Sequence, residues 1–227
     1  NYIIGGVYGI SHSVSQYFHL LKENKLLLEE NSKLKTQLFN HAKHSTAEPS
    51  LNQPYSLNSA LVYNNSYSLT NNYITLNKGS EDGIKEDYGV ITSKGIVGVI
   101  DRTTSKYSRV LSILNSKSKI NVKLNKTNHF GTLSWDSKSS GIVQLNDIQD
   151  LVKFTIGDSI TTSGFSSIFP ANIPVGTINS YRLNDTKDLY IIDVKLFNDM
   201  TNLGHVYIIK SKDREEIINL EKGEKNE

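Results

Sequence analysis

The sequence of 227 residues contains no cysteine, only four prolines, and a single methionine and tryptophan. The absence of cysteine excludes disulfide bonds, thiol catalysis and thiolate metal sites, and it fits a bacterial periplasm as well as a cytosol. No apolar run reaches the roughly 18 to 20 residues that a membrane-spanning helix needs. We therefore expect neither a disulfide framework nor a membrane span in this chain.

The chain also lacks an excess of charge of either sign. Its 25 basic and 23 acidic residues give a formal net charge of +2. A nucleic-acid-binding domain usually carries a basic patch or stripe, so the balance gives no reason to expect nucleic acid as a partner. The length allows one large or two small domains, and the hydrophobic content of 37% is that of a folded protein.

A heptad pattern runs from Ile10 to Leu38. Alternate steps of three and four residues place a positions at Ile10, Tyr17, Asn24, Asn31 and Leu38, and d positions at Ser13, Leu20, Leu27 and Leu34. Such a seam is typical of a coiled coil, and neither proline nor glycine occurs between Ile10 and Lys43. We predict a helix over residues 10–44, roughly 50 Å long, that pairs in a parallel coiled coil.

Two asparagines at a positions specify how the helices pair. A buried Asn is satisfied best by its twin across a parallel two-stranded axis, so it sets register and oligomeric state. Glu30 at g and Lys35 at the following e would add an exposed interchain ion pair worth less than about 1 kcal/mol. The predicted dimerisation residues are Tyr17, Leu20, Asn24, Leu27, Asn31, Leu34 and Leu38.

A second interpretation of this helix stays open. Leu21 and Leu28 occupy e positions and widen the apolar stripe. A wide stripe is also typical of a single amphipathic helix that packs on its own domain. The pattern alone does not choose between self-pairing and such packing.

Segments without periodicity flank the predicted body. Residues 1–9 are interpreted as a remnant that follows a removed membrane helix. Residues 45–58 contain Pro49, Pro54 and many Asn and Ser, which predicts a linker. Residues 210–227 form a charged tail that we expect to be mobile, apart from a short helix at residues 215–220.

Residues 59–209 show the period-two alternation of β-strands. Ile120, Val122 and Leu124, for example, alternate with polar residues. Turn signals separate about twelve short strands, and Lys94-Gly95 predicts a tight hairpin. The fold class is therefore mainly β with an N-terminal α-helix, and the body is predicted as two small six-stranded β-barrels, with a sandwich as the alternative. The barrel boundary is expected near residues 105–125, with the barrels either consecutive or nested.

One tripeptide suggests catalysis but lacks its context. Gly157-Asp158-Ser159 resembles the nucleophile loop of chymotrypsin-like proteases, which continues with Gly-Gly to form the oxyanion hole. Here β-branched residues follow, and His129 lies too close in sequence to come from a separate barrel. We predict no catalytic residue, although an unrecognised barrel hydrolase remains an alternative function.

Ligand-binding patterns are also missing. His41 and His44 share a helical face, but no third ligand has suitable spacing, so we predict no metal site. The chain has no glycine-rich phosphate loop, and no cofactor is predicted. A barrel that binds oligosaccharide or nucleic acid remains a further alternative.

Several segments together resemble the MreC family of bacterial rod-shape-determining proteins. The similar stretches are Leu21–Lys25, Glu29–Leu34, Asn77–Ile84, Tyr88–Ile91, Gly95–Ile100, Gly157–Gly164, Phe169-Pro170 and Ile173–Gly176. The resemblance extends from the helix to about Ile209. It lies in the order and spacing of these motifs.

The resemblance implies a function as well as a fold. MreC proteins have one membrane helix, a coiled coil and two barrels outside the cytoplasmic membrane, and their barrels resemble the protease fold without its catalytic residues. They self-associate as non-enzymatic scaffolds of the cell-elongation machinery. Their implied partners are a penicillin-binding transpeptidase, RodA, MreD and MreB. We thus expect the periplasmic part of a single-pass inner-membrane protein whose membrane helix is absent from this chain.

Overall fold

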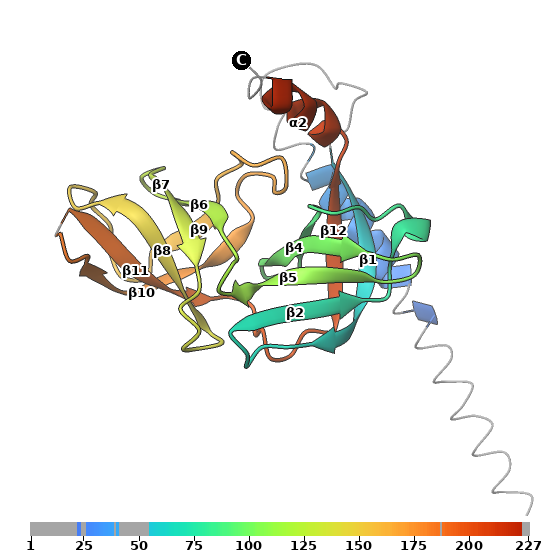
Figure 1. Ribbon diagram of the computed structural model, residues 1–227, viewed down its shortest axis with the longest axis horizontal. Coiled ribbons are helices and arrows are strands. Elements are labelled where there is room, and N and C mark those ends of the chain that lie inside the picture. The colour runs from blue at the N-terminus through green and yellow to red at the C-terminus, as the bar shows by residue number, and fades with distance from the viewer. Residues whose placement is uncertain (1–21, 24–25, 39, 41–54, 187, 224–227) are drawn as a thin grey trace, which may run out of the picture.

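The structure is a computed structural model that describes residues 22–23, 26–38, 40, 55–186 and 188–223. The described N-terminal residues 22–23, 26–38 and 40 are helical. Twelve β-strands follow, and the helix α2 (Arg214–Gly223) ends the described chain. Figure 1 shows two β bodies side by side, with the N-terminal helix in blue next to β1 and β12.

The first barrel contains six strands from two separate parts of the sequence. Its closed order is β1-β12-β3-β4-β5-β2, and all neighbours are antiparallel. The bounds are β1 (Tyr55–Asn65), β2 (Asn71–Leu76), β3 (Gly89–Ile91), β4 (Ile96–Thr103), β5 (Ser108–Asn115) and β12 (His205–Ser211). A short 3-10 helix, η1 (Ser80–Asp82), lies between β2 and β3.

The second barrel is inserted between β5 and β12. Its closed order is β10-β11-β8-β7-β6-β9. The bounds are β6 (Ile120–Leu124), β7 (Phe130–Ser134), β8 (Ile142–Gln149), β9 (Ser159–Thr162), β10 (Pro174–Leu183) and β11 (Leu189–Leu196). The prediction of two six-stranded barrels is confirmed, and the barrels are nested rather than consecutive.

Strand alternation fills both barrels with branched aliphatic side chains. In β6, Ile120, Val122 and Leu124 are buried, whereas Asn121 is exposed. Burial of one such side chain contributes about 1.5–3 kcal/mol. The expected hairpin at Lys94-Gly95 joins β3 to β4, where the Thr92 N–H donates to the carbonyl of Gly95 at 2.8 Å.

Two interior glycines permit close approach of neighbouring strands. A Cβ atom at Gly98 would lie 2.2 Å from the carbonyl oxygen of Leu111, and one at Gly176 would lie 2.1 Å from that of Lys195. The pairing register shifts close to both positions. Glycine at these places therefore allows the tight curvature of a small closed barrel.

Contacts from the 163–172 loop and the 197–204 segment join the barrels. The Phe169 ring packs against Gly89, where a Cβ atom would come within 2.6 Å of it. Asn198 donates to the carbonyl of Ile96 at 2.8 Å and accepts from the hydroxyl of Thr92 at 2.5 Å. Both Phe169 and Asn198 are buried.

The barrel extends beyond the boundaries predicted from the sequence. Residues 55–58, which we assigned to the linker, belong to β1, because β12 runs to Ser211 and pairs with them from Tyr55 onward. In the predicted mobile tail, residues 210–211 complete β12 and residues 214–223 form α2. Arg214 forms an ion pair with Asp87 at 2.6 Å, which fixes the start of α2 against the first barrel.

Candidate interaction surface

Polar side chains attach the N-terminal helix to the outer edge of β1. Asn40 accepts from the N–H of Tyr55 and donates to its carbonyl, both at 3.1 Å. One turn earlier, the Thr36 hydroxyl accepts from the N–H of Leu57 at 3.1 Å. These side chains thus form hydrogen bonds with backbone groups at the edge of the strand.

The same helix covers the outer face of β12. Four consecutive residues of β12, from Val206 to Ile209, are buried, which requires cover on both faces of the strand. The Nζ atom of Lys35 lies 5.7 Å from the centre of the Tyr207 ring. Burial raises the pKa of the Tyr207 phenol. Lys35 thus contacts its own barrel, a contact that competes with the predicted ion pair to Glu30 of a second chain.

The described part of the predicted seam faces away from the barrel. Leu27, Leu34 and Leu38 are 53%, 55% and 65% exposed, and Asn31 is exposed as well. The barrel-facing residues Leu28, Ser32 and Asn40 lie on another side of the helix. An exposed stripe of this kind on a folded chain is a candidate interaction surface. Tyr17, Leu20 and Asn24 lie outside the described residues.

The helix packs on its own domain, and pairing with a second helix through its exposed face stays a prediction. Packing on its own domain uses Leu28, an e position, together with polar residues that the heptad pattern does not single out. Ser32 and Thr36 are spaced one turn apart, and their hydroxyls donate to carbonyls within the helix. Ser32 and Thr36 lie off the heptad seam, and no sequence signal distinguishes them.

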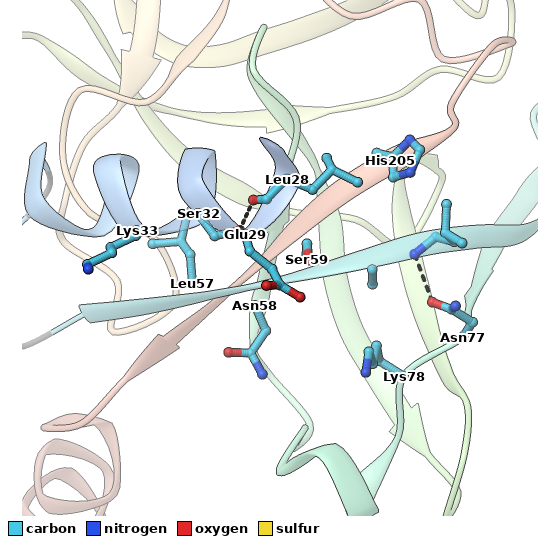
Figure 2. A pocket seen from close by; sticks show the side chains of 12 residues that line it. Leu28, Glu29, Ser32, Lys33, Leu57, Asn58, Ser59, Asn77, Lys78 and His205 are labelled. Atoms are coloured by element: carbon cyan, nitrogen blue, oxygen red, sulfur yellow. Dashed lines mark hydrogen bonds between the residues drawn. The ribbon is translucent and has the colours of Figure 1, made fainter. Parts of the chain in front are cut away.

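A groove of about 790 Å³ opens between the helix and the first barrel. Figure 2 shows helix residues on one side, β1 along the floor, and Asn77 and Lys78 at one end. The lining residues are Leu28, Glu29, Ser32, Lys33, Leu57, Asn58, Ser59, Ala60, Leu61, Asn77, Lys78 and His205. The groove therefore runs along β1, beyond the point where β2 stops pairing with it.

The tripeptide Gly157-Asp158-Ser159 has a structural role. Asp158 accepts from the N–H and the hydroxyl of Thr155 at 3.0 and 2.9 Å, and it pairs with Lys126 at 2.5 Å. These hydrogen bonds, foremost the one from Lys126, lower the pKa of Asp158. Ser159 begins β9. The carboxylate thus holds the turn that leads into the strand.

Within the described residues, no group of three or more His, Asp or Glu side chains could hold a metal ion. His41 and His44 lie outside that part of the chain. The helices of the described regions include none that is long and apolar enough to span a membrane.

The structure defines a class of protein in which one six-stranded barrel is inserted into another and an N-terminal helix is docked on the outer one. Residues 62–210 match the family described as rod shape-determining protein MreC, barrel core. This chain belongs to the MreC family, whose description is that of rod shape-determining proteins.

Curated relatives agree with this assignment. The chain is 27% identical to the cell shape-determining protein MreC of Listeria monocytogenes over 213 residues, which cover 91% of this chain and 72% of that protein. It is 24% identical to the Escherichia coli protein of the same name over 200 residues, covering 86% of this chain and 52% of that protein.

Solved structures share the fold. The Listeria MreC structure superposes with a TM-score of 0.66 at 27% identity, over 84% of this chain and 92% of that one. MreC in a complex between penicillin-binding protein PBP2 and MreC from Helicobacter pylori superposes with a TM-score of 0.56 at 18% identity, over 70% and 99% of the chains. At 18% identity, the likeness to the Helicobacter pylori structure establishes the fold alone.

Proposed function

We propose that this protein is a non-enzymatic, dimeric scaffold of the bacterial cell-elongation machinery. The observation that carries the proposal is the row of exposed leucines, Leu27, Leu34 and Leu38, on a helix already held to its barrel. Pairing two such rows removes apolar surface from water, and each Å² buried contributes about 25 cal/mol of favourable free energy. The helix would then continue through Asn24, Leu20 and Tyr17.

The parallel arrangement suits a membrane-anchored protein. Two helices that pair in parallel direct both N-termini the same way, as chains anchored in one membrane require. The scaffold would lie on the periplasmic side of the inner membrane, attached through a preceding membrane helix. One similar solved structure is the major periplasmic domain from the cell shape-determining filament MreC, which supports this placement.

The proposed partners are proteins of peptidoglycan synthesis and of the cytoskeleton. A penicillin-binding transpeptidase is supported by the Helicobacter pylori complex of PBP2 with MreC. RodA, MreD and MreB are proposed from the family resemblance. A scaffold needs binding surfaces rather than a reaction centre, and the structural role of Asp158 agrees with this.

Cysteine cross-linking tests the pairing and its direction. The native chain has no cysteine, so each substitution introduces a unique thiol. Asn31→Cys at an a position should give a disulfide-linked dimer on mild oxidation, because a parallel pair brings identical a positions together. Lys33→Cys, an exposed position off the seam, is the matched control. Equal cross-linking of both variants would contradict a specific parallel seam.

The enzymatic alternative has its own test. A serine-reactive phosphonate should leave Ser159 unmodified, since among the described residues no histidine or other base hydrogen-bonds to its hydroxyl. Stoichiometric labelling of Ser159, detected by mass spectrometry, would replace the scaffold assignment with a hydrolase.

A further inference from the structure

Part of β1 presents a free strand edge. Alternate residues of a strand direct their N–H and C=O groups to the same side. On the side of β1 away from β12, Asn40 binds both backbone groups of Tyr55, and Thr36 binds the N–H of Leu57. Further along, the Asn77 side chain accepts from the N–H of Leu61 at 2.8 Å, and the Asn77 N–H donates to the C=O of Leu61 at 3.1 Å. Strand β2 pairs with β1 only from Val62 onward.

Between these partners the backbone of Ser59 remains open. Among the described residues, neither the outward N–H nor the C=O of Ser59 has a hydrogen-bond partner, and the same holds for the C=O of Leu57. Ser59 is only half-buried, and it lines the groove beside the helix. The groove thus contains three successive strand-edge groups, on the line that β2 would follow if it continued.

We propose that this groove binds an extended peptide segment of a partner protein, which adds a strand to β1 beside Ser59. A row of alternating donors and acceptors at strand spacing is matched by a peptide backbone, and strand addition is an established mode of peptide recognition. The volume of about 790 Å³ gives room for a short extended segment.

The groove walls define the side chains of that segment. Leu28 and Leu57 offer an apolar wall, so the peptide carries an apolar residue facing them. Of the ionisable lining residues, Lys33, Lys78 and His205 are basic and only Glu29 is acidic, although Lys78 also pairs with Asp82 at 2.6 Å. This balance favours an acidic residue or a terminal carboxylate in the peptide.

The groove is separate from the proposed dimer seam. The seam leucines Leu27, Leu34 and Leu38 do not line it. Peptide binding and helix pairing can therefore fail independently.

One substitution removes the backbone donor of the open edge without removing a hydrogen bond of the barrel. Ser59→Pro removes an N–H that faces away from β12, and proline is tolerated at an edge whose N–H makes no ladder bond. Ser59→Ala keeps the backbone donor and removes only the side-chain hydroxyl, so it is the matched control. Circular dichroism and thermal unfolding check that both variants fold.

The probe is a phage-displayed library of linear peptides of about nine residues, enough to span the groove at about 3.3 Å per residue. Peptides enriched on the wild-type protein are synthesised, and their affinities are measured by fluorescence anisotropy. We expect binding at least about tenfold weaker to Ser59→Pro and unchanged binding to Ser59→Ala. N-methylation of the peptide backbone should also weaken binding.

Three results would overturn the proposal. They are no enrichment of any peptide, equal affinity for wild type and Ser59→Pro, and tight binding of a peptide that is helical when bound. If Ser59→Pro instead abolished self-association in sedimentation, a second copy would be the occupant of the groove. Unchanged self-association, with lost peptide binding, supports the proposal.

Discussion

Single polar side chains hold the N-terminal helix on the barrel, whereas its seam leucines point outward. Ser32 and Asn40 are buried, and Leu34 and Leu38 are more than half exposed. Buried polar groups are stable only when they are hydrogen-bonded, as Asn40 is to Tyr55. The exposed leucines gain stability only from a partner.

At the residue scale, Gly98 tests the curvature of the first barrel. Gly98→Ala should lower the free energy of unfolding by about 1–3 kcal/mol, because the new methyl group would lie 2.2 Å from the carbonyl oxygen of Leu111. Gly141→Ala, where a Cβ atom meets nothing within 4 Å, is the control. Urea unfolding of both variants measures the difference. Equal stabilities would show that β4 and β5 can separate freely.

Asp158 gives a pH-dependent prediction. Its pKa is lowered in the folded protein, so its contribution to stability is present above the unfolded pKa of about 3.9 and is lost as the pH falls below it. Asp158→Asn should therefore have a lower free energy of unfolding than wild type at pH 7, and this difference should be smaller at pH 3. Glu86→Gln, at an exposed carboxylate, is the control. A stability difference that does not change with pH would show that the charge of Asp158 does not cause it.

At the element scale, every strand was predictable, but the strand ends and the helix contact were not. Alternation at positions such as Ile120 and Val122 indicates a strand whatever its neighbours are. The start of β1 was hidden because Ser56 and Asn58 suggested a linker, and only pairing with β12 shows that they are strand residues. Nesting depends on the long-range pairing of β1 with β12, which no local pattern contains.

The residues of the candidate interaction surface could be predicted only in part. Heptad spacing predicts Leu27, Leu34 and Leu38 as seam residues; the structure leaves them exposed, and their pairing stays a prediction. The docking residues Thr36 and Asn40 were missed, because hydrogen bonds to a strand edge follow no periodicity. The groove beside Ser59 depends on where β2 stops, which is a tertiary property.

The docking of the helix is itself testable at this scale. Asn40→Ala should lower the free energy of unfolding by about 1–3 kcal/mol, because the two hydrogen bonds that Asn40 makes with the backbone of Tyr55 are lost. Hydrogen exchange of residues 26–38 should become faster. Gln37→Ala, at an exposed helix position, should change neither quantity. Unaltered exchange in Asn40→Ala would mean that other contacts alone hold the helix.

At the scale of the whole molecule, the docked helix would link the proposed dimerisation to the placement of the barrels. Because Asn40 and Thr36 attach the helix to β1, pairing of two helices would set the orientation of the barrels on either side of the seam. The groove beside Ser59 would remain available on each chain. Such an arrangement offers repeated binding surfaces, as a scaffold requires.

Sedimentation equilibrium of matched variants distinguishes a protein paired through the Leu27 seam from a monomer. Leu27→Asp places a carboxylate in the seam and should shift the protein from dimer to monomer, because an unpaired charge would be buried in the interface. Leu26→Asp makes the same change at a neighbouring, equally exposed position off the seam. We predict that wild type and Leu26→Asp sediment as dimers and Leu27→Asp as a monomer. A wild-type monomer at high concentration, or a dimer undisturbed by Leu27→Asp, would contradict the account.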